Sequence, residues 1–152
     1  MENLNLAEQI NIEDENLQVV VFRLGIEEYA VDILYVQEIK KLLSITRVPH
    51  AENYKEGVVN LRGNIIPIIS FHTRFSLQAQ GKETDKRIIV FKIGELEFGA
   101  IVDAVVEVVH LKREDIDEAT KLYDSIDDDY ISGVIKRNDR LLIVLDLKKI
   151  FD

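Results

Sequence analysis

The residue types that most often perform chemistry are few and scattered in this sequence. The three histidines, His50, His72 and His110, lie 22 and 38 residues apart, so no pair has the spacing that places two metal ligands on one helix face. The chain has no cysteine, which removes thiolate ligands and cysteine nucleophiles. No serine stands in a G-x-S-x-G motif, and no glycine-rich phosphate loop is present. We therefore expect no metal, no cofactor and no catalytic residue.

Acidic residues are abundant but do not form a selective pattern. Paired carboxylates of a hydrolase could be drawn from Asp32, Asp103 and Asp146, but with 28 acids in the chain the sequence favours no pair. The run 127–129 lacks the alternating ligands, glycine and terminal glutamate of a calcium loop. A carboxylate hydrolase stays open as an alternative, as does a sensor barrel that binds a small ligand in an apolar cavity.

Two charged residues stand apart from the rest. Glu38 lies inside an otherwise apolar segment, and Arg62 precedes the glycine of a predicted hairpin turn in NLRGNIIPI. Each is either an ordinary surface charge or a hot spot of a protein interface, where arginine is enriched.

Composition indicates an ordered cytoplasmic protein with protein partners. Hydrophobic residues make up 47% of the chain, and the formal net charge is -9. An acidic surface repels phosphate backbones, so we expect no nucleic acid partner. Residues 1–16 are rich in acids and are predicted to be a flexible tail. The sequence contains neither a signal-peptide pattern nor an apolar run of membrane-spanning length, about 18 to 20 residues.

The sequence contains an internal duplication. Residues 20–39 align without a gap on residues 89–108, and residues 57–75 align on residues 133–151. The blocks keep their order but the offset grows from 69 to 76, which places an insertion at about 112–130. We infer repeat 1 at about 17–81 and repeat 2 at about 82–152, each too small to be stable alone.

Each repeat reads as β structure. Alternating and β-branched runs separated by turn residues predict the following hairpins: 18–24 with 28–34, 58–62 with 65–69, 87–93 with 97–103, and 131–136 with 141–146. A fifth strand is expected near 45–48 and near 105–110, and short helices at 35–42, 113–118, 121–126 and 147–151. The predicted fold is all-β, with two five-stranded SH3-like or OB-like barrels and a few short helices.

Several motifs resemble one family. FRLGIEEYAVDILYVQEIKK, NLRGNIIPII, VDAV and RLLIVLDLKKIF, in this order over about residues 17–152, are similar to CheW, the coupling protein family of bacterial chemotaxis. The resemblance implies two β-barrels that exchange segments, so barrel boundaries need not follow the repeat boundary. It also implies a non-enzymatic adaptor between the histidine kinase CheA, through its CheW-like regulatory domain, and the cytoplasmic tip of methyl-accepting receptors. Contact with the membrane would be indirect, through receptor arrays.

The resemblance also implies interface residues. Glu38 and Arg62 match functional positions of the family, and the receptor tip is expected in an apolar groove between the barrels. The complete predicted receptor and kinase interface is Val36, Glu38, Ile39, Leu61, Arg62, Val102 and Val105. Where the family commonly continues with Asp-Leu-Arg, this chain has Ser70-Phe71-His72, to which we assign no role. Asp146, at the equivalent place in repeat 2, is predicted to cap the last helix.

Overall fold

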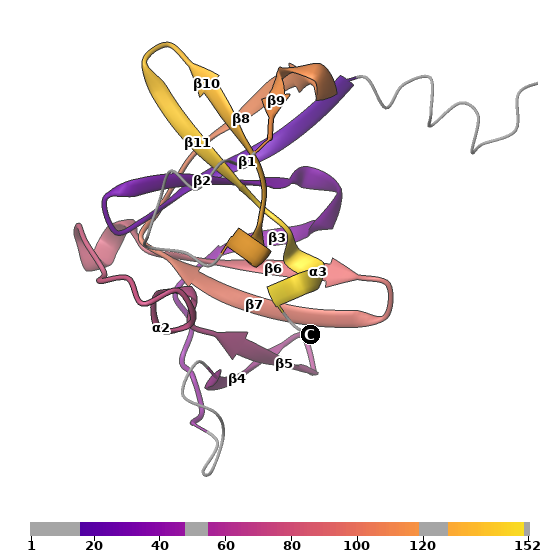
Figure 1. The fold of residues 1–152 in the computed structure, drawn as a ribbon. Helices are drawn as coiled ribbons and strands as arrows, with labels where there is room; N and C mark the ends of the chain where they lie inside the picture. The colour runs from indigo at the N-terminus through magenta and orange to yellow at the C-terminus, as the bar shows by residue number, and fades with distance from the viewer. Residues whose placement is uncertain (1–15, 48–54, 119–127, 151–152) are drawn as a thin grey trace, which may run out of the picture.

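The computed structural model describes residues 16–47, 55–118 and 128–150. Two curved, mainly antiparallel sheets lie one above the other, and the short helices lie beside them (Figure 1). Within the described residues, no helix combines the length and the apolar character that crossing a bilayer requires. The prediction of an all-β fold with a few short helices is confirmed.

The elements follow the duplication along the chain. In the first half they are β1 (Asn16–Leu24), β2 (Glu27–Asp32), η1 (Ile33–Tyr35), β3 (Val36–Lys41), β4 (Lys55–Leu61), β5 (Asn64–Ile69), α2 (Phe71–Arg74) and η2 (Glu83–Asp85). In the second half they are β6 (Arg87–Ile93), β7 (Leu96–Val102), β8 (Ala104–Lys112), η3 (Arg113–Asp115), β9 (Ile116–Asp117), η4 (Asp128–Tyr130), β10 (Ile131–Arg137), β11 (Arg140–Leu145) and α3 (Leu147–Ile150).

The two repeats exchange strands. One sheet has the order β8-β1-β2-β11-β10-β9 and the other has the order β3-β6-β7-β5-β4 (Figure 1). Each sheet therefore combines the first hairpin of one repeat with the later strands of the other repeat. The repeats join through two parallel pairings, β2 with β11 and β5 with β7. We call the sheets sheet A, which contains β1, and sheet B, which contains β3.

The four predicted hairpins are present as antiparallel pairs. One turn lies a residue earlier than expected: Leu61 pairs with Asn64, so Arg62 and Gly63 form the turn instead of Gly63 and Asn64. Both turn residues have positive φ, +53° and +87°, as a two-residue type I′ hairpin requires.

Other expected elements were wrong. Residues 35–42 are not a helix, because β3 pairs with β6 and its residues alternate between half-buried and exposed, which is the period of a strand. β3 is the fifth strand of its repeat, whereas the segment expected near 45–48 forms only a bridge from Thr46 to Val58. The helix expected at 113–118 is a 3₁₀ turn followed by β9, which adds a sixth strand to sheet A.

The C-terminal helix and the fifth strand of repeat 2 are confirmed as α3 and β8. The helix expected at 121–126 and residues 1–15 of the predicted tail 1–16 lie outside the described residues, whereas Asn16 is the first residue of β1.

The buried side chains form three clusters. One lies inside sheet A and includes Val19, Val21 and Leu142, and a second lies inside sheet B and includes Ile66 and Ile88. The third and largest lies between the sheets and takes residues from both. It contains Val20, Phe22, Leu24, Tyr29, Val31, Ile69, Phe71, Phe75, Ile89, Phe91, Phe98, Ala100, Val102, Ile143, Leu145, Leu147 and Ile150. We call this third cluster the shared core, and it makes the two barrels one packing unit.

A glycine at an equivalent place in each sheet allows another backbone segment to approach closely. In sheet B, the backbones of Thr46 and Val58 exchange two hydrogen bonds of 2.8 Å. A Cβ on the neighbouring Gly57 would lie 2.2 Å from the carbonyl oxygen of Thr46. Gly133 holds the equivalent place in sheet A, where a Cβ would lie 2.8 Å from the carbonyl oxygen of Asp117 on β9. The Gly-Val pair that begins the second block of each repeat is therefore the site where the barrel edges meet.

We expect Gly57→Ala to destabilise the protein by at least about 2 kcal/mol, because the methyl group displaces the Thr46 backbone and φ is +151°. Urea denaturation measures the effect. Gly81→Ala is the matched control, since its φ is also positive (+85°) but no atom lies within 4 Å of the added Cβ. Equal losses of stability in the two variants would contradict a steric role for Gly57.

Candidate protein-interaction site

A β-bulge in β3 sets the direction of the Glu38 side chain. Val36 pairs with Phe91 and Glu38 pairs with Val90, so Gln37 is an extra residue on β3. Bulges of this kind redirect side chains at the edge of a sheet. Glu38 consequently lies on the half-buried face of the strand, with 19% of its side chain exposed. Ile39 lies on the outer face and is 40% exposed.

Arg62 reaches Glu38 from the opposite edge of sheet B. The guanidinium donates two hydrogen bonds to the carboxylate, one from Nη2 to Oε2 and one of 3.3 Å from Nη1 to Oε1. Such paired contacts are the strong form of an arginine–carboxylate interaction. β3 and β4 are the two edges of the sheet, so the pair joins the edges where the barrel closes. A side chain other than glycine at positive φ is strained, and the ion pair holds Arg62 in that conformation.

The arginine changes the acidity of its partner. The hydrogen bond from Arg62 holds the pKa of the Glu38 carboxyl below its ordinary value; desolvation opposes this shift, and the charges of Arg62 and Lys40 add to it. A lowered carboxyl pKa means that the pair stabilises the fold above the unfolded-state pKa. This contribution is lost as the pH falls through the folded-state pKa.

We expect Arg62→Gln to raise the pKa of Glu38 towards the ordinary value for glutamate, because the charged donor is replaced by a neutral one. A carbon-13 NMR titration of the glutamate side-chain carboxyls measures this shift. Arg47→Gln is the control, since Arg47 pairs with Glu56 on the same barrel. An unchanged Glu38 titration in Arg62→Gln would show that the pair does not persist in solution.

Exposed apolar side chains surround the tip of the hairpin that carries Arg62. β5 and β7 run parallel, with Ile68 opposite Gly99, so their first residues lie at the same end of the barrel. Ile65 at the start of β5 is 63% exposed, and Leu96 at the start of β7 is 39% exposed. We call Ile65 and Leu96, together with the Glu38–Arg62 pair, the tip surface.

The other predicted interface residues occupy two environments. Val36 and Val105 are half-buried and pack against the edge of the shared core, and the duplication makes them equivalent, at the starts of β3 and β8. Leu61 and Val102 are buried, with 7% and 0% of their surface exposed. Leu61 packs in the cluster inside sheet B and Val102 in the shared core, so neither lies on the surface.

A second ion-pair network, in sheet A, was not anticipated. Arg140 on β11 donates hydrogen bonds to Glu28 at 2.7 and 3.1 Å and to Glu107 at 2.6 Å. The Arg140 hydrogen bond lowers the pKa of Glu28, and both carboxylates raise the pKa of Arg140. Glu107 aligns with Glu38 in the duplication, which was the available signal. The duplication did not predict Arg140, because the residue that aligns with Arg62 is Asn138.

The departure at Ser70 has a structural explanation. The Ser70 hydroxyl accepts a hydrogen bond of 3.1 Å from the Thr73 backbone and caps α2. Asp146 accepts one of 3.1 Å from the Lys148 backbone at the start of α3, so the predicted cap is confirmed. Serine and aspartate are both favourable helix caps, so the change from the family pattern preserves the cap.

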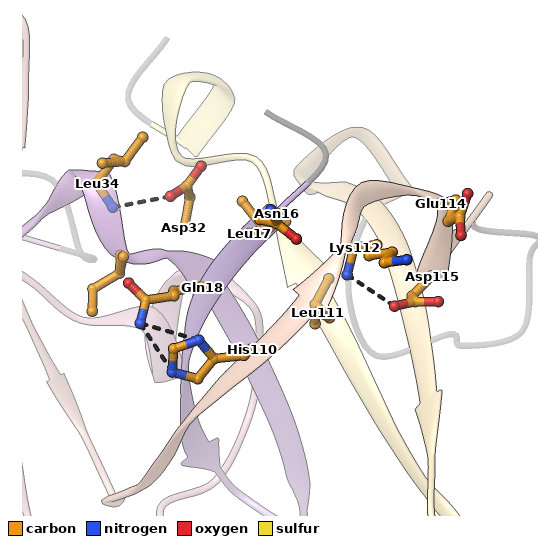
Figure 2. A pocket seen from close by; sticks show the side chains of 11 residues that line it. Asn16, Leu17, Gln18, Asp32, Leu34, His110, Leu111, Lys112, Glu114 and Asp115 are labelled. Atoms are coloured by element: carbon orange, nitrogen blue, oxygen red, sulfur yellow. Dashed lines mark hydrogen bonds between the residues drawn. The ribbon is translucent and has the colours of Figure 1, made fainter. Parts of the chain in front are cut away.

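A surface cavity of about 1220 Å³ lies where β1 begins and β8 ends (Figure 2). Its wall is mixed, since it includes Leu34, which is 82% exposed, as well as charged residues such as Lys112 and Asp115. Gln18 and His110 also line it, with their side-chain nitrogens 3.0 Å apart. None of the seven predicted interface residues lines this cavity or a smaller one of about 250 Å³.

The fold consists of two barrels with a shared core, and exposed apolar side chains lie around the Glu38–Arg62 ion pair. These features define an adaptor that presents surfaces to other proteins. A model of the CheW-like domain matches residues 18–152. The chain therefore belongs to the CheW family, the scaffold and adaptor proteins of chemotaxis.

Individual relatives agree with this assignment. Chemotaxis protein CheW of Treponema pallidum is 36% identical, covering 92% of this chain and 85% of the relative. Chemotaxis protein CheW of Helicobacter pylori is 38% identical, covering 90% of this chain and 82% of the relative. The crystal structure of the scaffolding protein TtCheW from Thermoanaerobacter tengcongensis is 38% identical, with a TM-score of 0.83 over 90% of this chain and 88% of that chain.

Proposed function

We propose that this protein couples the histidine kinase CheA to the cytoplasmic tips of methyl-accepting receptors and thereby supports kinase regulation in signalling arrays. It does so in the cytoplasm, without catalysis, and approaches the membrane only through the receptors. The observation that carries the proposal is the tip surface, where a bidentate ion pair holds a strained hairpin tip among exposed apolar side chains.

The receptor contact is assigned to the edge of the shared core, where the two barrels meet. Val36 and Val105 each pair with a phenylalanine of the shared core, Phe91 and Phe22 respectively, and remain partly accessible at its edge. Apolar side chains at such an edge suit an α-helical hairpin, which would insert its own apolar face. Val102, buried in the shared core, lies beneath this edge, whereas Leu61 packs inside sheet B.

The kinase contact is assigned to the tip surface. Ile65 and Leu96 project from the ends of two neighbouring strands, where a CheW-like barrel of CheA could cover them. These exposed apolar side chains suit a small, exchangeable contact below about 1,200 Å². Many such contacts within an array bind more firmly than any one alone.

Co-sedimentation tests the proposal. The full chain is mixed with cognate CheA and a receptor cytoplasmic fragment, and pelleted protein and kinase activity are measured together. We expect a ternary complex with raised kinase activity, and neither effect when the chain is omitted. Absence of a ternary complex with correctly folded chain would overturn the proposed function.

A further inference from the structure

Asp103 is a buried carboxylate that the proposed interface does not use. It lies between β7 of sheet B and β8 of sheet A, where the chain crosses from one barrel to the other. Its side chain is 1% exposed. Burying a carboxylate is unfavourable unless hydrogen bonds or an opposite charge compensate it. Its contacts therefore indicate what the residue stabilises.

One oxygen of Asp103 receives donors from three separate segments. Oδ2 accepts hydrogen bonds of 2.8 Å from the Gly25 backbone and 3.1 Å from the Gln80 backbone, and lies 3.0 Å from Nε2 of His72. Gly25 belongs to the β1–β2 turn of sheet A, His72 belongs to α2 after β5, and Gln80 lies near the end of repeat 1. Oδ1 is buried and accepts no hydrogen bond from any described residue. The hydrogen bonds of the carboxylate therefore all lie at the crossover between the two barrels.

We propose that Asp103 is a positioning residue that fixes the crossover between the barrels and, through it, the start of β8. The Asp103 backbone also donates a hydrogen bond of 3.0 Å to the Arg23 carbonyl, so both its main chain and its side chain hold β1. Val105 lies two residues further on and packs at the edge of the shared core. On the basis of the proposed function, Asp103 acts on receptor binding through the position of Val105.

The same geometry separates Asp103 from the exposed apolar side chains at the starts of β5 and β7. Asp103 follows the last residue of β7, whereas Leu96 is the first. A strand of 7 residues separates the two ends by about 23 Å. A disturbance at Asp103 should therefore reach Val105 and leave Ile65 and Leu96, the residues assigned to the kinase contact, unchanged.

Substitutions of His72 test the side-chain contact that it makes with Asp103. Its side chain is 15% exposed, and its Nε2 lies 3.0 Å from Oδ2 of Asp103. His72→Gln keeps an N–H donor, whereas His72→Leu removes it. If the junction depends on a hydrogen bond donated to Oδ2 of Asp103, it tolerates His72→Gln and does not tolerate His72→Leu.

The experiment compares wild type with Asp103→Asn, His72→Gln and His72→Leu, after urea denaturation has shown each to be folded. NMR amide exchange at Gly25 and Gln80 reports the junction, and binding to a receptor fragment and to the CheA regulatory domain is measured separately. We expect Asp103→Asn and His72→Leu to exchange at least about tenfold faster at both amides and to bind the receptor fragment about tenfold more weakly. CheA affinity should change less than twofold, and His72→Gln should resemble wild type.

The outcomes separate the two proposals. Unchanged amide exchange in Asp103→Asn would overturn the junction role whatever the binding results are. Faster exchange with unchanged receptor affinity, or with an equal loss of CheA affinity, would overturn the positioning role. If wild type binds no receptor fragment, the proposed function fails. The positioning of β8 is then decided by exchange at the Val105 amide, which must also accelerate in Asp103→Asn for the proposal to stand.

Discussion

Arg62→Glu is expected to abolish the ternary complex of this protein with CheA and the receptor fragment. The substitution places two carboxylates at the closure of sheet B, where Arg62 now donates two hydrogen bonds to Glu38. It also removes an arginine whose side chain is 64% exposed on the tip surface. Loss of an interface hot spot costs about 2 kcal/mol or more, which corresponds to about 30-fold in affinity. Co-sedimentation and kinase activity measure the effect.

Two further variants identify the cause of that loss. Glu38→Arg combined with Arg62→Glu restores an ion pair with reversed polarity, and should recover binding if closure of the barrel edge is what matters. Recovery will be absent if partners contact the arginine itself. Arg47→Glu is the control for charge, since Arg47 is 81% exposed and belongs to a different ion pair on the same barrel. A ternary complex that tolerates Arg62→Glu would remove the tip surface from the interface.

Phe71→Ala is expected to destabilise both barrels together by about 3–5 kcal/mol. Phe71 is fully buried in the shared core, with ring centroids 5.3 Å from Phe75, 6.2 Å from Phe91 and 6.3 Å from Phe22. Phe22 lies in sheet A and Phe91 in sheet B. The cavity that the substitution leaves therefore weakens the packing between the barrels, and not the interior of one barrel. Urea denaturation followed by circular dichroism measures the change.

The manner of unfolding tests whether the shared core unites the barrels. Amide probes in sheet A and in sheet B should lose protection at the same urea concentration in wild type and in Phe71→Ala, because neither barrel retains the shared core alone. Ile26→Ala is the control: this side chain is 86% exposed, and its removal should change stability by less than about 0.5 kcal/mol. Separate transitions for the two sheets would contradict a single packing unit.

Local sequence rules predicted the hairpins but not the edges that close the barrels. Turn residues and β-branched runs act within a few neighbours, so the four hairpins could be predicted. β3 was mistaken for a helix because Gln37 and Glu38 are adjacent polar residues that interrupt the apolar–polar alternation of its sequence, and its strand character is defined only by the pairing with β6. The bridge from Thr46 to Val58 likewise depends on a contact between distant edges.

The candidate site divides in the same way. The charge of Glu38 in an apolar segment and the position of Arg62 beside a turn glycine were visible in the sequence, and the resemblance to CheW gave them a role. Their hydrogen bonds, and the buried positions of Leu61 and Val102, required the structure. His72 received no role because its partner, Asp103, lies 31 residues away along the chain.

The sequence by itself determined the family, the all-β class, the duplication and the hairpins, because each depends on residue order and short-range conformational preference. The tertiary structure decided which hairpins share a sheet, since the parallel pairings of β2 with β11 and β5 with β7 join opposite repeats. It also decided which charges meet: Arg62 with Glu38, Arg140 with Glu28 and Glu107, and His72 with Asp103. Side chains far apart in the chain come together only after strand exchange and burial of the shared core have fixed their backbones.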